Sequence, residues 1–246
     1  MKFSNRAVCA VLMFALAASL CFAGGSGESA DSAADLNTIK KAGVLKVGVK
    51  DDVPKFGFLN KTTRKYEGME IELAKLIAKD ILGDETSITF IPVTAKTRGP
   101  LLDMGEVDLI IATFTITEER KLIYNFSTGY YTDAVGMMVK RASNITSLSD
   151  CDGKIIGVAQ SATSRKAIHD AAAKLGVNIA FMEFATYPEI KAALDSGRID
   201  VFSVDKTILN GYVDSEDIIL AESFAPQNYG VASKLSNKTL AKHVRT

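Results

Sequence analysis

Cysteine is scarce in this 246-residue chain, which contains only three. Cys9 lies inside an apolar N-terminal stretch and Cys21 lies at its edge, so Cys151 is the one cysteine left in the part expected to fold. A framework of disulfides is therefore excluded. We interpret Cys151 as a small residue of the core or of a loop.

A charge imbalance and a long apolar run are both missing beyond residue 23. The first 23 residues contain Lys2 and Arg6 and no acidic residue, so the 29 basic residues fall to 27, against 29 acidic ones. This near balance argues against nucleic acid or another polyanion as a partner. A helix that spans a bilayer needs about 20 predominantly apolar residues, and no later stretch approaches that length.

The N-terminus has the pattern of a secretory signal peptide. Lys2 and Arg6 precede an apolar stretch over 7–18, and small residues follow at 23–25. Positive charge, an apolar segment and small residues in this order are typical of a segment that is removed on export. We therefore predict a signal peptide over 1–23 and a periplasmic or cell-surface location.

The next residues, 24–37, are expected to form a flexible tether. They are rich in Ser, Ala, Gly and acidic residues and show no apolar periodicity. A lipid anchor on Cys21 is the alternative to cleavage after residue 23. Leu20 stands where a lipobox has Gly or Ala, which argues against the anchor.

One pattern occurs twice in the remaining part, which at about 210 residues is long enough for two domains. Strand-like runs alternate with helical spacing in the order β-α-β-α-β. The first unit has strands over 44–49, 88–94 and 107–112 and helices over 69–82 and 99–104; the second has strands over 154–158, 178–184 and 199–204 and helices over 163–175 and 188–196. The pattern predicts an α/β protein with two lobes and mostly parallel sheets.

Polar residues follow several of the predicted strands. Lys50 follows the first strand, the sequence ATFT at 112–115 follows the third, and Asp205 follows the last apolar run. Open α/β sheets bind ligands outside the carboxyl ends of their strands. Two facing lobes therefore place these residues, together with 159–163, around one cleft.

Two extended segments connect the units. The residues at 131–139 lead from the first unit to the second, and those at 228–233 lead back. Two crossover strands between lobes form a hinge. We therefore expect the lobes to close on a ligand.

Longer motifs in the chain are YEGMEIELAKLIA, KTRGPLLDMGEVDLIIATFTITEERKLIYNFSTGYYTDAVGMMV, GVAQSATS, IKAALDSGRIDVFSVD and NYGVAS. They resemble the polar amino-acid solute-binding proteins of ABC importers, and most of all their aspartate/glutamate-binding branch. The resemblance covers residues 38 to about 240 and implies the type II periplasmic-binding-protein fold. It places lobe 1 over 38–134, lobe 2 over 135–226 and a return crossover over 227–246. Members of this family usually continue into a long C-terminal helix on the first lobe, so we expect that helix to be missing.

The resemblance also implies roles for residues around an amino-acid ligand. Arg120 would hold the α-carboxylate with both arms of its guanidinium group. Asp205 would accept from the α-ammonium, with Thr113 as a second acceptor. Thr115 and the N–H groups at the helix start near Thr163 would donate to the carboxylate.

Further residues are expected to decide which amino acid binds. Lys50 and Arg98 would converge on the ligand side chain, and a buried cation without an anion costs about several kcal/mol, so L-aspartate or L-glutamate is expected. Tyr187 aligns with a family position that reaches the ligand, and Phe56 or Phe58 would stack beside it. The sequence does not rank aspartate, glutamate and glutamine.

Two alternative functions share this fold. A cyclohexadienyl-type dehydratase would need a proton donor, but Asp205 is assigned to the ammonium, and His169 and His243 lie outside the expected cleft. An adhesin or chemosensory binding protein is the second alternative, and no surface in the sequence identifies it. We therefore expect a monomer without catalytic residues, cofactor or metal, whose partners are an acidic amino acid and the permease subunits of an ABC importer.

Overall fold

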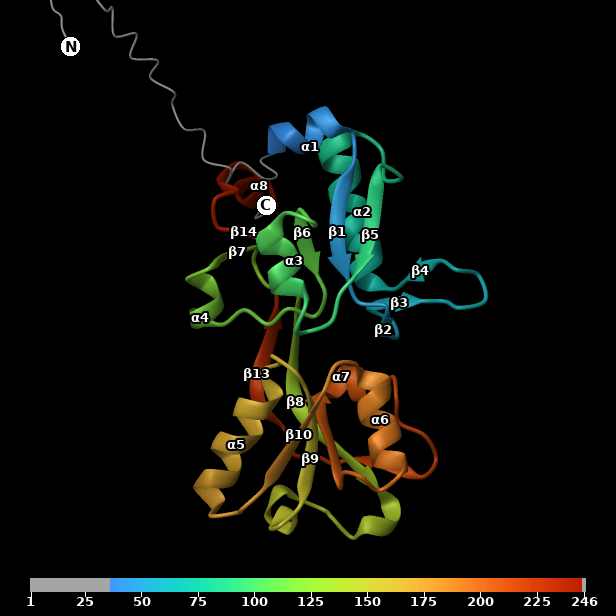
Figure 1. Cartoon of the computed structure of the whole chain (residues 1–246), viewed down its shortest axis with the longest axis vertical. Coiled ribbons are helices and arrows are strands. Elements are labelled where there is room, and N and C mark those ends of the chain that lie inside the picture. The colour runs from blue at the N-terminus through green and yellow to red at the C-terminus, as the bar shows by residue number, and fades with distance from the viewer. Residues whose placement is uncertain (1–35, 245–246) are drawn as a thin grey trace, which may run out of the picture.

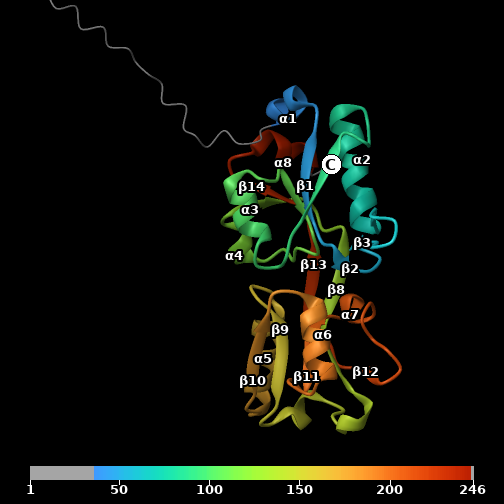
Figure 2. The same ribbon diagram turned by 45° about the vertical axis from the view of Figure 1, so that its right-hand side comes forward.

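A computed structural model describes residues 36–244 and shows two α/β lobes that are stacked along the long axis of the molecule (Figures 1 and 2). Each lobe is built around its own sheet, and a third, small sheet lies beside the first. The predicted two-lobed α/β fold is confirmed. The predicted signal peptide and most of the predicted tether lie outside the described residues.

Lobe 1 contains a five-stranded sheet in the order β5-β1-β6-β14-β7. Its parallel strands are β1 (Leu45–Val49), β5 (Ile88–Pro92) and β6 (Leu109–Ile111), while β14 (Ala232–Lys234) runs antiparallel to β6 and to β7 (Tyr124–Phe126). The helices of this lobe are α1 (Leu36–Ala42), α2 (Met69–Leu82), α3 (Arg98–Met104), α4 (Glu118–Lys121) and α8 (Lys238–Val244). The prediction of a tether up to residue 37 is wrong at its end, because residues 36 and 37 begin α1.

The longest helix of lobe 1, α2, forms for the reason that its sequence indicates. Ile71, Ala74, Ala78 and Ile81 recur at helical spacing and are buried. They pack with Val47 of β1 in the same core cluster. This packing fixes α2 on one face of the sheet, with its first turn near the end of β1.

Lobe 2 contains the sheet β10-β9-β11-β8-β12, and β13 pairs with a further stretch of β8. Its strands are β9 (Ile155–Ala159), β10 (Ala180–Phe184), β11 (Val201–Asp205), β8 (Tyr131–Lys140), β12 (Asp217–Ile219) and β13 (Phe224–Tyr229). Its helices are α5 (Ser164–Leu175), α6 (Tyr187–Asp195) and α7 (Lys206–Leu209), with short 3-10 turns at η1 (Arg141–Ser143) and η2 (Leu148–Cys151). The β-α-β-α-β order is confirmed in both lobes.

The hinge consists of β8 and β13, which lie side by side between the lobes (Figure 1). They are antiparallel, with Tyr131 opposite Tyr229, and the register shifts between Phe224 and Pro226. After Tyr229 the chain enters β14 of lobe 1, so both crossovers join the lobes at neighbouring points.

Some elements were not anticipated from the sequence. The small antiparallel sheet consists of β2 (Asp52–Val53), β3 (Gly57–Leu59) and β4 (Tyr66–Glu67). Near the other end of the chain, α8 buries Leu240 in the core cluster that contains α1 and α2. None of the helices within 36–244 has the length and apolar character needed to cross a membrane.

Candidate ligand-binding cleft

Polar residues of both lobes lie where the parallel strands end. Lys50 follows β1, Thr113 and Thr115 follow β6, Thr163 precedes α5, and Asp205 ends β11. Except for Thr163, which is half-buried, these residues are 6 % exposed or less. Buried polar groups usually have hydrogen-bond or ion-pair partners.

The cleft is closed in this structure. The Tyr187 N–H of lobe 2 donates to Asp52 Oδ2 of lobe 1 at 3.3 Å, and the Tyr212 hydroxyl donates to the Asp52 carbonyl. On the other side of the cleft, Arg120 Nη2 of lobe 1 donates to the Ser161 carbonyl of lobe 2 at 3.2 Å. The lobes therefore touch on two sides of the predicted site.

Lys50 has an anionic partner within its own lobe. Its Nζ atom lies 3.0 Å from Asp52 Oδ1 and 4.7 Å from the centre of the Tyr187 ring. Burial lowers the pKa of Lys50, and the Asp52 carboxylate opposes that effect. Much of the Lys50 charge is thus already balanced before a ligand is considered.

Arg98 and Arg120 share one aromatic ring. The central guanidinium carbons of Arg98 and Arg120 lie 4.1 Å and 4.5 Å from the centre of the Phe114 ring. Burial, and to a lesser extent the charge of Arg98, lower the pKa of Arg120 to about 9. Phe114 was not predicted from the sequence, although it stands between the two threonines of the ATFT motif. An anion near this ring would relieve the repulsion between the two cations.

Arg98 is 3 % exposed and lies in the first turn of α3. Its Nη1 atom donates to the carbonyls of Ala112 and Thr113 at 2.7 Å and 3.2 Å. Within residues 36–244 it forms no ion pair with a carboxylate, and its Nε atom is buried without a hydrogen-bond partner. Arg98 is therefore a buried cation whose bonding is incomplete.

Arg120 reaches the cleft from α4. The Thr117 hydroxyl caps this short helix by accepting from the Arg120 N–H at 3.2 Å. The side chain then turns back, and Nη1 donates to the Thr115 carbonyl at 2.8 Å. Together with its contact to Ser161, this bond aims the guanidinium group along the boundary between the lobes.

Glu70 is a residue of the site that the sequence analysis missed. It is fully buried, and its Oε1 atom accepts from the Thr113 N–H at 2.6 Å and from the Tyr130 hydroxyl at 2.5 Å. Thr113 has a φ of 46°, a left-handed conformation that is strained for a β-branched residue. The Glu70 carboxyl stabilises this turn, and burial raises its pKa. Its spacing with Ala74 and Ala78 on the buried face of α2 was the available signal.

Asp205 is the acidic group of lobe 2 in the cleft. Its Oδ2 atom accepts from the Tyr229 hydroxyl of the hinge at 2.5 Å. The pKa of Asp205 is raised to about 7, mainly by burial and partly by the nearby Asp133, while the bond from Tyr229 opposes the rise. A cation beside Asp205 would shift the group back to its ionised form.

Thr115 and Thr163 share a partner that was not foreseen. Thr115 Oγ1 and Thr163 Oγ1 each lie 2.7 Å from Gln227 Oε1 of β13. The expected role of Thr115 as a donor to a ligand does not fit this hydrogen bond, because its proton is directed to Gln227. The residue lies 112 positions from Thr115 in the chain, so no local pattern indicates the contact.

The aromatic residues singled out from the sequence occupy different places. Tyr187 begins α6, is 4 % exposed and lies under Lys50, and burial raises its pKa. Phe56 is buried, with its ring edge-on to Tyr131 of the hinge at 5.0 Å. Phe58 is half-buried in β3 of the small sheet. Tyr187 and Phe56 thus line the boundary between the lobes.

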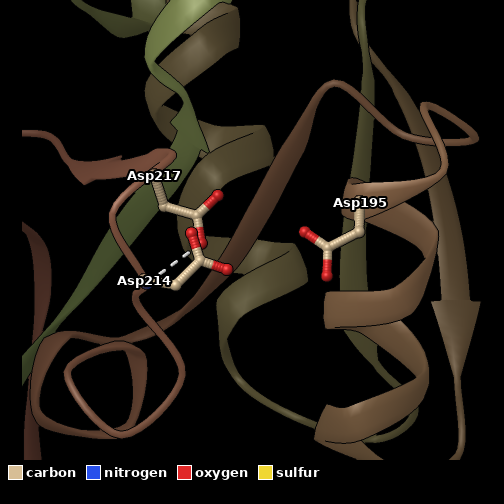
Figure 3. Close-up of side chains that lie close together, drawn as sticks. All are labelled: Asp195, Asp214 and Asp217. Carbon is tan, nitrogen blue, oxygen red and sulfur yellow. Dashed lines mark hydrogen bonds between the residues drawn. The ribbon is translucent and has the colours of Figure 1, made fainter.

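An acidic cluster lies elsewhere in lobe 2, where the carboxylates of Asp195, Asp214 and Asp217 face one another (Figure 3). Lys191 Nζ lies 2.5 Å, 2.8 Å and 3.1 Å from oxygens of these three residues. Lys140 Nζ lies 2.5 Å from Asp195 and 3.0 Å from Asp217. Each of the three carboxylates therefore has at least one ammonium group as an ion-pair partner.

Comparison with known proteins gives a consistent assignment. The family model described as "Bacterial extracellular solute-binding proteins, family 3" matches residues 45–171, and a second model, "NMT1/THI5 like", matches residues 115–243. The glutamine-binding protein of Geobacillus stearothermophilus is 40% identical over 221 residues, which are 87% of this chain and 83% of the relative. The ABC transporter glutamine-binding protein GlnH of Bacillus subtilis is 38% identical over 227 residues, or 90% of this chain and 81% of the relative.

A solved structure shows the same fold. The ABC transporter periplasmic binding protein of Brucella ovis with glutathione bound superposes with a TM-score of 0.80 at 28% identity, covering 86% of this chain and 69% of that chain. An L-glutamate/L-aspartate-binding protein of Pseudomonas aeruginosa is 28% identical over 182 residues, 72% of this chain and 60% of the relative. Closeness to the acidic branch is therefore not confirmed, since the glutamine-binding relatives are more similar. All of these proteins are named as binding proteins, and the solved structure has the two-lobed fold described above. The chain belongs to the family 3 extracellular solute-binding proteins.

Proposed function

We propose that this protein captures an acidic amino acid, L-glutamate or L-aspartate, outside the cytoplasm and delivers it to the permease subunits of an ABC importer. It acts as a monomer and performs no chemical step on the ligand. The proposed contacts are Lys50, Arg98, Thr113, Thr115, Arg120, Thr163, Tyr187 and Asp205. Family membership supports amino-acid binding for transport, and the charges of the cleft support the acidic side chain.

The α-groups of the ligand account for two of the buried charges. The ligand carboxylate pairs with Arg120, and its ammonium pairs with Asp205, which stands on the opposite lobe. Opposite charges at the two ends of the ligand then link the lobes, which favours closure. This pairing is the same for every α-amino acid and gives no preference among side chains.

Arg98 is the observation that favours an acidic side chain. Lys50 is paired with Asp52 at 3.0 Å, whereas Arg98 donates to two carbonyl groups and has no carboxylate partner within the described chain. Asp205 and Glu70 both lie near enough to favour the charged form of Arg98, but burial raises the pKa of each carboxyl and reduces its anionic character. A ligand carboxylate at Arg98 would balance the remaining cation.

Glutamine is the rival ligand, since two similar relatives carry that name. Calorimetric titration of refolded, ligand-free protein with L-glutamate, L-aspartate and L-glutamine separates the two possibilities. We expect an acidic ligand to bind at least about tenfold more tightly than glutamine, a difference of about 1.4 kcal/mol. A wild-type protein that prefers glutamine would refute the acidic assignment while leaving amino-acid binding intact.

Substitution of Arg98 tests the residue itself. Arg98→Gln should weaken the acidic ligands at least about tenfold and change glutamine binding by less than about threefold. Arg64→Gln, in the exposed loop between β3 and β4, is the matched control and should change neither. Equal losses for acidic and neutral ligands in Arg98→Gln would remove Arg98 from the side-chain pocket.

A further inference from the structure

Gln227 is a hinge residue that joins both walls of the cleft. It is 2 % exposed and lies in β13, close to the point where the chain returns to lobe 1. Its Oε1 atom lies 2.7 Å from Thr115 Oγ1 of lobe 1 and 2.7 Å from Thr163 Oγ1 of lobe 2. A single oxygen of the hinge thus holds one side chain from each lobe in the closed form.

The other end of the Gln227 amide determines its orientation. Nε2 donates to the Ala225 carbonyl at 2.9 Å, and a carbonyl oxygen only accepts, so the amide would lose this bond if it turned over. Oε1 must therefore face both threonines. Each hydroxyl has one proton, and both protons are directed to Gln227. In the closed cleft, Thr115 and Thr163 then offer a ligand only oxygen lone pairs.

The start of α5 agrees with this arrangement. Thr163 is the N-cap residue of this 12-residue helix, and a threonine there usually accepts from an N–H of the first turn. Thr163 makes no such bond, because its side chain turns toward Gln227. The first N–H groups of α5 are consequently left without a side-chain cap and can serve an anion at the cleft.

We infer that Gln227 is a positioning residue that stabilises the closed form and sets the direction of hydrogen bonding at Thr115 and Thr163. It acts as a latch between the lobes, and it leaves both hydroxyl oxygens able only to accept hydrogen bonds from a ligand. The latch follows from contacts within the chain. The consequence for the ligand rests on the proposed function.

The test compares Gln227→Met, which keeps the length of the side chain and removes its hydrogen bonds, with Asn228→Met. Asn228 is the exposed neighbour on the same strand and serves as the matched control. Spin labels at Lys79→Cys and Lys174→Cys, which are exposed positions on the two lobes, report the distance between the lobes by double electron–electron resonance. The native Cys151 is buried and its pKa is raised to about 11 by that burial, so it should stay unlabelled at neutral pH.

Two measurements are made on each variant. Without added ligand, Gln227→Met should lower the ratio of closed to open molecules at least about tenfold, and Asn228→Met should leave it unchanged. With L-glutamate, Gln227→Met should raise the dissociation rate at least about tenfold and change the association rate by less than about threefold. If Gln227 served only to stabilise the fold, Gln227→Met would instead lower the urea midpoint of unfolding, and the dissociation rate would not rise selectively over the association rate.

Thr163 supplies an independent check of the hydrogen bond. Thr163→Val should behave like Gln227→Met, and Thr163→Ser, which keeps the hydroxyl, should restore the wild-type ratio. Equal ratios in Gln227→Met and wild type, or a serine variant as weak as the valine variant, would overturn the latch. If no amino acid binds the wild type, the proposed function fails while the ratio without ligand still tests the latch. A wild type with no closed molecules under either condition overturns both.

Discussion

Asp205→Asn is expected to stabilise the protein and to weaken ligand binding at the same time. In the closed structure, burial raises the pKa of Asp205 to about 7 from its usual value of 3.8. The folded state therefore binds this proton more tightly than the unfolded state does. Ionising the buried Asp205 carboxyl therefore destabilises the folded state. This destabilisation is absent below about pH 4, where both states are protonated, and is complete above about pH 7, where both are ionised.

The size of this destabilisation follows from that pKa difference. A pKa of about 7 against 3.8 corresponds to about 4 kcal/mol at pH 8. This is an upper limit, because opening of the lobes hydrates the carboxylate. Asparagine is neutral and keeps an oxygen that accepts from the Tyr229 hydroxyl. We therefore expect Asp205→Asn to add about 1–4 kcal/mol to the free energy of unfolding at pH 8 and less than about 0.5 kcal/mol at pH 4.

Urea unfolding followed by far-ultraviolet circular dichroism measures this difference, which suits a chain without tryptophan. Asp170→Asn is the control, because Asp170 is an exposed partner of Lys166 on α5 and should leave the stability nearly unchanged at any pH. Binding of every amino acid should fall at least about tenfold in Asp205→Asn. A variant that is less stable than wild type at pH 8, or a difference that does not grow with pH, would refute the reasoning.

Two further substitutions test the packing of the lobes. Asp217→Asn should lower the free energy of unfolding, measured in urea, by about 2–3 kcal/mol, because Asp217 is fully buried and its carboxylate lies 3.0 Å from Lys140 and 3.1 Å from Lys191. Millimolar calcium should leave the melting temperature of the wild type unchanged. A clear rise would contradict the view that Lys140 and Lys191 are the partners of this acidic cluster. Gly68→Ala should lower the free energy of unfolding by more than about 3 kcal/mol, because φ is 123° and an added Cβ would lie 2.2 Å from the Phe56 carbonyl. The matched change Gly176→Ala, at φ 70° with no atom within 4 Å, should lower it by only about 1 kcal/mol, and equal losses would show that the contact is unimportant.

The strands and the residues that follow them could be predicted from the sequence, because the apolar residues of a buried strand and the polar residues directly after it are neighbours in the chain. Lys50, Asp205 and the threonines after β6 were found in this way. Glu70 and Gln227 were missed, because each acquires its role from a residue 43 or 112 positions away. The small sheet was also missed, since strands of two or three residues carry no recognisable period.

The buried charges of the cleft explain why closure should depend on a ligand. In the closed structure burial lowers the pKa of Lys50, Arg98 and Arg120 and raises that of Asp205, so every one of these groups loses hydration when the lobes meet. Lys50 recovers part of this loss from Asp52, whereas Arg98 and Arg120 gain mainly carbonyl groups. Without a ligand, opening restores water to these groups, which opposes the contacts that hold the lobes closed. Under the proposed function, an acidic amino acid would supply two carboxylates and one ammonium to Arg98, Arg120 and Asp205. The differential affinity that drives closure would then arise from the same charges that select the ligand.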